Sequence, residues 1–110
     1  MDLTLHRRAL QHFNHAEFFD AHELWEDLWR ASNGAEKKHL QGLIQVAVAL
    51  HHHSKGNVAG ARSLLKRAAH NLHSCPPHFH GIDLPTLRKS LEAWQSALAD
   101  GRPAPPLPRL

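Results

Sequence analysis

The segment from Leu40 to Leu50 is apolar on nearly every side of a helix, since Gln41 and Gln45 are its only polar side chains. A helix of this kind is stable when other elements surround it. The helical spacing continues on both sides, so we expect one central apolar helix over about 35–54, ended by Gly56. No part of the chain alternates with period two, and β-branched residues are scarce. The sequence therefore predicts an all-α fold.

Four more helices would complete a compact bundle of about five. The first covers roughly Leu3–His12, and the second lies within residues 13–29. The short Gly56-Asn57 turn leads into a fourth helix over Val58–His73 and predicts an antiparallel hairpin with the central helix. Residues 73–83 should form a loop because they contain two prolines and a glycine. Asp83 then caps the fifth helix, which has Pro85 in its first turn.

Two helix starts resemble capping boxes, in which a cap residue and an acid three positions later satisfy each other's backbone N–H groups. Asn14 and Glu17 have this spacing at the second helix, where Phe13 and Phe18 are also placed to form a hydrophobic staple. Asn33 and Glu36 repeat the pattern at the central helix. We therefore expect Asn14 to begin the second helix.

The 110 residues are enough for one domain with its own core, which we place at residues 1–100. Residues 101–110 are proline-rich and are expected to be an extended or mobile, flexible tail. Its Pro105–Arg109 segment matches a PxxP ligand pattern, but such short patterns are more typical of a solvated tail.

Composition favours a cytoplasmic protein. Cys75 is the single cysteine, so no internal disulfide can form, and a reducing compartment fits. The charged first residues lack the apolar core of a signal peptide, and the longest apolar stretch is far shorter than a membrane span. We therefore expect no membrane partner.

The net charge of +3 comes from basic residues spread along the chain. Proteins that bind nucleic acid usually gather these residues on one face and add aromatic side chains. Only the fourth helix concentrates positive charge, at Arg62, Lys66 and Arg67. The pattern argues against a nucleic-acid partner and leaves weak binding through this helix as a third hypothesis. Twelve histidines make the charge sensitive to mild acid.

The main functional lead is a cluster on the second helix. His22 and Glu26 are four residues apart and therefore neighbours, and Trp29 lies on the same side. A histidine and a carboxylate at this spacing can supply two ligands to a divalent metal, or can orient an imidazole for proton transfer. The alternative is an ordinary hydrogen bond within the helix, beside packed tryptophans.

The central helix offers a third ligand. Gln41, Gln45 and His52 share one stripe, and a short turn makes this helix an antiparallel neighbour of the second. That arrangement could bring His52 toward His22 and Glu26 and leave coordination positions open, as in catalytic zinc, iron or manganese sites. We expect Trp29, Gln41 and Gln45 to contact the ligand, with Glu23 or Glu26 as the catalytic carboxylate. The alternative is a buried polar network that fixes helix register.

Other histidines form weaker candidates. Because adjacent helical residues point about 100° apart, His51, His52 and His53 should not share one ion, and we expect one inward and two outward. The loop with His73, Cys75, His78 and His80 is a rival zinc site, although the paired CxxC halves of a strong zinc motif are absent. No base for Cys75 as a nucleophile is evident.

The segments Glu17–Glu23 with Glu26 and Trp29, then Leu40–Gln45, and later His52, Gly56-Asn57 and Gly81–Leu84, resemble the bacterial and archaeal domain of unknown function family 309. The resemblance covers roughly residues 12–99. It implies a small all-helical fold whose function is not established. It also implies a functional HxxxExxW motif, suggested to bind metal, which is His22, Glu26 and Trp29 here.

Our first hypothesis is thus an uncharacterised protein with a divalent metal or small-ligand site at His22, Glu26 and His52, suited to metal-dependent hydrolysis if it is an enzyme. The second is a non-catalytic helical interaction module that self-associates as a homo-oligomer and needs no cofactor. In that case the same polar residues are structural.

Overall fold

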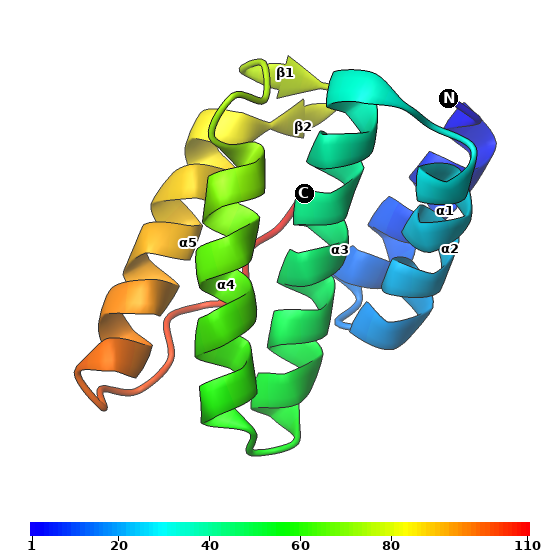
Figure 1. Ribbon diagram of the computed structural model, residues 1–110. Helices are drawn as coiled ribbons and strands as arrows, with labels where there is room; N and C mark the ends of the chain where they lie inside the picture. The colour runs from blue at the N-terminus through cyan, green and yellow to red at the C-terminus, as the bar shows by residue number, and fades with distance from the viewer.

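A computed structural model of the chain describes residues 1–110 and consists of five helices and one small hairpin (Figure 1). The elements follow in the order α1 (Leu3–Asn14), α2 (Phe18–Arg30), α3 (Gly34–Ser54), α4 (Val58–Leu72), β1 (His78–Phe79), β2 (Ile82–Asp83) and α5 (Leu84–Ala99). The expected all-α bundle of five helices is confirmed. None of the helices combines the length and the apolar character that crossing a membrane requires.

Helix α3 is the centre of the bundle, as expected. It packs against α2 on one side and α4 on the other, and it contributes more buried residues than any other helix. Figure 1 shows α1 covering α2 at one end of this row and α5 following α4 at the other. The core is continuous, with Trp25 of α2 and Trp94 of α5 as its largest fully buried side chains.

The α3–α4 contact depends on a missing side chain. A Cβ atom on Gly42 would lie 2.5 Å from Cγ of Leu72 and 2.8 Å from its Cδ2. Such distances are far inside van der Waals contact, so only glycine lets α4 approach the backbone of α3 this closely. The pair forms the antiparallel hairpin predicted from the short Gly56-Asn57 turn.

The start of the second helix differs from the prediction. Asn14 is the last residue of α1, and α2 begins at Phe18, with Glu17 as a cap residue whose side chain makes no capping bond. The chain reverses at Ala16, which has a φ of 59°, and a left-handed residue there prevents a helix from starting at Asn14. The predicted contact between Phe13 and Phe18 does form, with ring centroids 5.1 Å apart.

The second capping box is also absent. Asn33 is the cap residue of α3, but its side chain makes no capping bond, and Glu36 turns toward His80 instead. The cap predicted for the last helix is confirmed, because Asp83 accepts hydrogen bonds from the backbone and the hydroxyl of Thr86.

The segment predicted as a loop contains the β1–β2 hairpin. His78 pairs with Asp83 and Phe79 with Ile82, so two residues make the turn. Both have positive φ, 45° for His80 and 87° for Gly81, as a tight hairpin turn requires. The hairpin lies across the end of the bundle where α3 begins (Figure 1).

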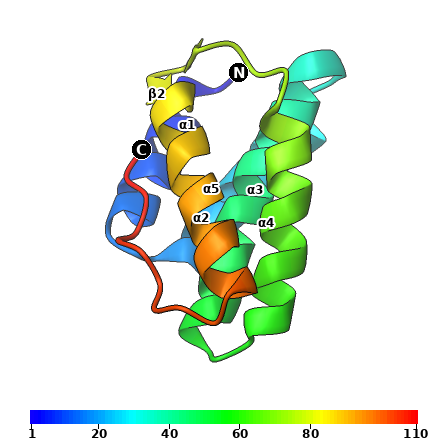
Figure 2. The same ribbon diagram turned by 90° about the vertical axis from the view of Figure 1, so that its left-hand side faces the viewer.

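The proline-rich residues after α5 are extended and return along the bundle. Figure 2 shows this segment in red, running back beside α5 toward α1. The indole Nε1 of Trp94 donates to the carbonyl of Pro106 at 3.0 Å, and the backbone N–H of Leu110 donates to Oδ1 of Asn14 at 2.8 Å. The expected mobility of residues 101–110 stays a prediction.

Candidate cation site on helix α2

His22 and Glu26 lie together on α2, as their spacing predicts. Nε2 of His22 is 3.4 Å from Oε2 of Glu26, and the two side chains are 16% and 40% exposed. The other ring nitrogen, Nδ1, is 2.5 Å from the carbonyl oxygen of Phe19, where it can only donate a hydrogen bond. The Phe19 ring packs against the imidazole at a centroid distance of 4.7 Å. The hydrogen bond from Nδ1 therefore fixes the tautomer of His22, and the two contacts with Phe19 fix the orientation of its ring.

This orientation leaves two acceptors facing each other. In a neutral His22 with its proton on Nδ1, Nε2 presents a lone pair, and Glu26 is acceptor-only when ionised. Two lone pairs 3.4 Å apart repel each other unless a cation lies between them. Either a proton on Nε2 or a metal ion satisfies both atoms. Histidines that bind metals are typically held in this way, with the distal nitrogen donating to a carbonyl.

Glu26 is oriented by its neighbours as well. Its second oxygen, Oε1, is 3.4 Å from Arg30 Nη2, one turn further along the helix. Arg30 also pairs with Asp27 at 2.8 Å. Because the guanidinium occupies Oε1, Oε2 is the oxygen left to face His22. Glu23 is exposed and forms no ion pair, so it stands outside this arrangement.

Trp29 is half-buried next to the start of α3. The Nζ atom of Lys37 lies 4.1 Å from the centroid of its ring, in a cation–π contact. Trp29 thus links the end of α2 to the first turn of α3, and it flanks the site through helical spacing.

The structure does not bring His52 to this pair. Its Nδ1 is 3.5 Å from Nδ2 of Asn57 in the α3–α4 turn. His51 is the imidazole that approaches α2, with its ring 5.6 Å from Phe19, while His53 packs against Trp94 of α5 at 5.0 Å. The three adjacent histidines contact different partners, but all are half-buried, so the expectation of one inward and two outward side chains is wrong. His22, Glu26 and His52 are not among the groups whose ligand atoms lie within 4.8 Å of one another, and metal binding by the three together stays a prediction.

The two glutamines of the central helix also separate. Gln45 is buried and faces α4, where its Oε1 accepts a hydrogen bond from Nδ2 of Asn71 at 2.8 Å. Gln41 is half-buried and forms no hydrogen bond within the chain. The role of Gln41 and Gln45 in contacting a ligand beside His22 and Glu26 stays a prediction.

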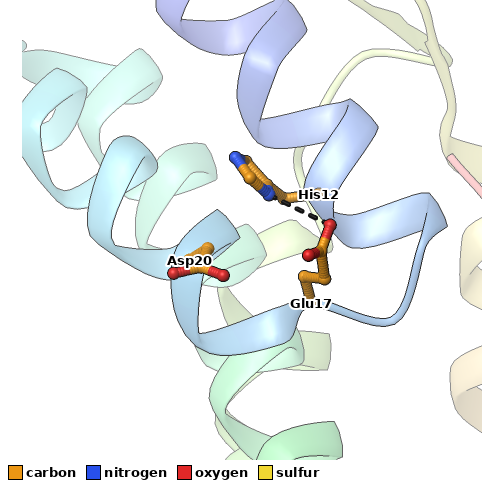
Figure 3. A group of neighbouring side chains, drawn as sticks. All are labelled: His12, Glu17 and Asp20. Carbon is orange, nitrogen blue, oxygen red and sulfur yellow. Dashed lines mark hydrogen bonds and ion pairs between the residues drawn. The ribbon is translucent and has the colours of Figure 1, made fainter.

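Three potential ligand atoms gather instead at the α1–α2 corner (Figure 3). His12, Glu17 and Asp20 each have one such atom within 4.8 Å of the others, and they form the one group of three or more in the chain. Nδ1 of His12 is 3.2 Å from Oε1 of Glu17. The sequence does not reveal this group, because Glu17 also fits a capping box and the Ala16 turn that assembles the corner has no sequence signal.

The rival histidine loop does not converge either. Cys75 is buried, and desolvation raises the pKa of its thiol to about 11, which disfavours the thiolate that metals and electrophiles need. Nε2 of His80 is 3.5 Å from Oε1 of Glu36, and the carbonyl of His80 accepts a hydrogen bond from His6. The loop is thus held to α1 and α3 through His80.

Two buried histidines were not anticipated. His6 bridges Trp25 and the carbonyl of His80, and His39 packs edge-on against Phe79. Burial lowers the pKa of both side chains below 6.5. His6 falls at helical spacing with Ala9 and Phe13, the other buried residues of α1, and this periodicity was the one available signal.

The chain is similar in sequence to known proteins. An uncharacterized protein of Aquifex aeolicus (strain VF5) is 34% identical over 103 residues, which cover 93% of this chain and 31% of that protein. The uncharacterized protein YpuF of Bacillus subtilis (strain 168) is 40% identical over 50 residues, 44% of this chain and 29% of that protein. The chain thus spans less than a third of the length of these two relatives. Residues 6–64 match the family described as Domain of unknown function (DUF309), and the chain belongs to this family.

Proposed function

We propose that this domain binds a divalent metal ion through Nε2 of His22 and Oε2 of Glu26, with open coordination positions for water and a small-molecule ligand. The proposal is supported above all by the two acceptors that face each other over 3.4 Å, each held in place by a second contact. The stretch shared with the family, residues 6–64, contains both side chains.

The spacing of the two atoms suits a metal. Zinc bonds to histidine nitrogen and carboxylate oxygen are about 2.0–2.1 Å long, and two such bonds that span 3.4 Å enclose an angle of about 110°. This angle is close to tetrahedral. Imidazole and carboxylate together suit zinc, iron and manganese.

The His22–Glu26 pair is a better candidate than the α1–α2 corner because it is ordered before any ion arrives. The His22 side chain is only 16% exposed, and its distal nitrogen is bonded to a carbonyl. At the corner Glu17 is 53% exposed and Asp20 is also exposed, so binding would have to immobilise both. Each immobilised glutamate side chain costs up to about 2 kcal/mol in rotamer entropy.

Metal-assisted hydrolysis is the reaction class that we assign if the domain is an enzyme. A divalent ion bound with open positions would supply a polarised water or a Lewis acid for a carbonyl or phosphoryl group. Glu26 would act as a ligand and Asp27 is paired with Arg30, so we assign the role of base to Glu23, one turn before Glu26, whose exposed carboxylate forms no ion pair.

Metal titration tests the proposal. Untagged protein is stripped with a chelator and titrated with Co²⁺ and Zn²⁺, with d–d absorption and calorimetry as readouts. We expect one site in the wild type, lost or weakened by about 10- to 100-fold in His22→Ala and Glu26→Gln, as for other ligand and support residues. The matched control is His12→Ala, which removes the histidine of the other carboxylate pair and should leave the site intact.

Two titration outcomes would contradict a metal site at His22 and Glu26. If His12→Ala abolishes binding and His22→Ala does not, the ion belongs to the α1–α2 corner. If no variant changes the titration and His22→Ala only lowers stability, the polar residues are structural. The interaction-module hypothesis is then preferred, and sedimentation analysis of the wild type would measure the self-association that it requires.

A further inference from the structure

Beyond Glu36 in the first turn of α3, the α3–α4 hairpin carries no acidic side chain. The sequence has no aspartate or glutamate between Glu36 and Asp83, while this interval contains six lysines and arginines. Three of the six, Arg62, Lys66 and Arg67, lie exposed on α4 together with His70, and we call these four residues the α4 basic face. None of the four takes part in any of the six ion pairs of the structure. The charges of Arg62, Lys66 and Arg67 are therefore available to an external anion.

A hollow of about 530 Å³ lies beside this face. Its volume is within the range of roughly 300–1,000 Å³ that small-molecule sites occupy. All of its lining side chains are polar or cationic, and none is acidic: Gln45, Ser63, Lys66, Arg67, His70 and Asn71. Five of these come from one face of α4, at helical spacing, and Gln45 reaches the hollow from α3.

The hollow contains a fixed amide pair. Gln45 is only 9% exposed, and its Oε1 accepts a hydrogen bond from Nδ2 of Asn71 at 2.8 Å. This bond orients the Gln45 amide, and its Nε2 donates to no group of the chain. Nε2 is not enclosed, since it is absent from the buried polar atoms that lack a partner. A donor with a defined direction thus stands beside Lys66, Arg67 and His70.

We propose that this hollow binds the phosphate group of a phosphorylated small molecule. The Arg67 guanidinium can take two phosphate oxygens at once, and Lys66 supplies a second positive charge. Ser63, His70 and the Nε2 of Gln45 add neutral or cationic donors to the remaining oxygens. No lining residue is an acceptor with negative charge, so a dianion meets no repulsion there.

A small molecule fits these observations better than a nucleic-acid strand. Sites for single strands combine cationic grooves with aromatic platforms on which bases stack, and the lining contains no aromatic side chain. The six residues line a single hollow. The proposal is independent of the metal site, whose side chains belong to α2.

Calorimetric titration with pyrophosphate at fixed ionic strength tests the inference, with a fluorescent oligothymidylate as the second probe. We expect one pyrophosphate per chain and a loss of affinity of at least about tenfold in the double variant Lys66→Glu/Arg67→Glu, because hydrogen bonds to charged groups are lost. The matched control is Arg7→Glu/Arg8→Glu, an adjacent exposed pair on α1 with the same change in charge. Gln45→Leu leaves the charge unaltered and should weaken binding by about tenfold through the lost donor.

Three results would overturn the inference. The first is the absence of pyrophosphate binding to the wild type. The second is an equal loss of pyrophosphate affinity in the α1 and α4 double variants, or undiminished affinity in a folded Gln45→Leu variant. Either outcome would mean that general electrostatic attraction accounts for the binding. The third is binding of oligothymidylate without pyrophosphate, which would assign the basic face to nucleic acid. Circular dichroism of each variant confirms that it is folded.

Discussion

The indole Nε1 of Trp25 donates a hydrogen bond to Nδ1 of His6 across 3.1 Å, between two rings in the core. Because Nδ1 accepts, the proton of a neutral His6 is on Nε2, which donates to the carbonyl of His80 at 2.9 Å. One neutral imidazole thereby joins α1, α2 and the β1–β2 hairpin. Protonation would place a second N–H group against the indole N–H and break the bond.

The first prediction is that the domain loses stability in mild acid. Burial is the main cause that lowers the pKa of His6 and of His39 below 6.5. The unfolded chain then binds more protons than the folded one below that pH, so this stability is present above pH 6.5 and declines as the pH falls through the folded values. Urea denaturation across this range measures the decline. The side chain introduced in His6→Gln cannot titrate, so the unfolding free energy of this variant should fall less steeply as the pH decreases. An equally steep fall in the variant and the wild type would contradict the role of His6.

The second prediction concerns the close contact of Gly42 and Leu72. Gly42→Ala should cost about 1–3 kcal/mol of unfolding free energy, because the new methyl group overlaps Cγ and Cδ2 of Leu72. Leu72→Ala alone should cost about 2–5 kcal/mol as a core truncation. In the double variant the methyl group enters the vacated space, so the two costs should not add. Chemical denaturation measures the unfolding free energy of each variant. If the losses in the two single variants add in the double variant, the new methyl group does not overlap the Leu72 side chain.

The approximate positions of the helices could be predicted, because hydrophobic periodicity is a local property of each segment and does not depend on how the helices pack. The Leu40–Leu50 run predicts a central helix because it has no polar side that could face water. The turn at Ala16 could not be predicted in this way. Alanine carries no preference for positive φ, and tertiary contacts such as Phe13 with Phe18 impose it.

The site was predictable only within one helix. His22 and Glu26 meet because helix geometry dictates it, whereas His52 was placed by an assumed register between α2 and α3. In the structure His51 is the residue that meets Phe19. A change of one helical residue turns a side chain by about 100°, so a small error of register removes a ligand. The His6–Trp25 bond depends on packing of separate helices and leaves no local pattern.

The third prediction is that Cys75 is unreactive in the folded protein. Its side chain is 4% exposed, and desolvation raises the pKa of its thiol to about 11. The thiolate is the reactive form, so a disulfide reagent at a pH of about 8 should label native protein only through unfolding. Absorbance of the released thiolate measures the rate. The same protein in urea is the control, and it should react completely; equally fast labelling without urea would contradict the prediction.

The fourth prediction is that the C-terminal tail stabilises the domain. Deletion of residues 103–110 removes the acceptor of the Trp94 indole, a side chain that is only 2% exposed, and so should cost about 1–3 kcal/mol and shift tryptophan emission to the red. Asn14→Ala leaves the Trp94 bond in place and removes the two hydrogen bonds between Asn14 and Leu110, so it should cost less, about 0.5–1.5 kcal/mol. Urea denaturation followed by fluorescence measures both. If both variants match the wild type, the tail is mobile in solution, because docked contacts could not then contribute.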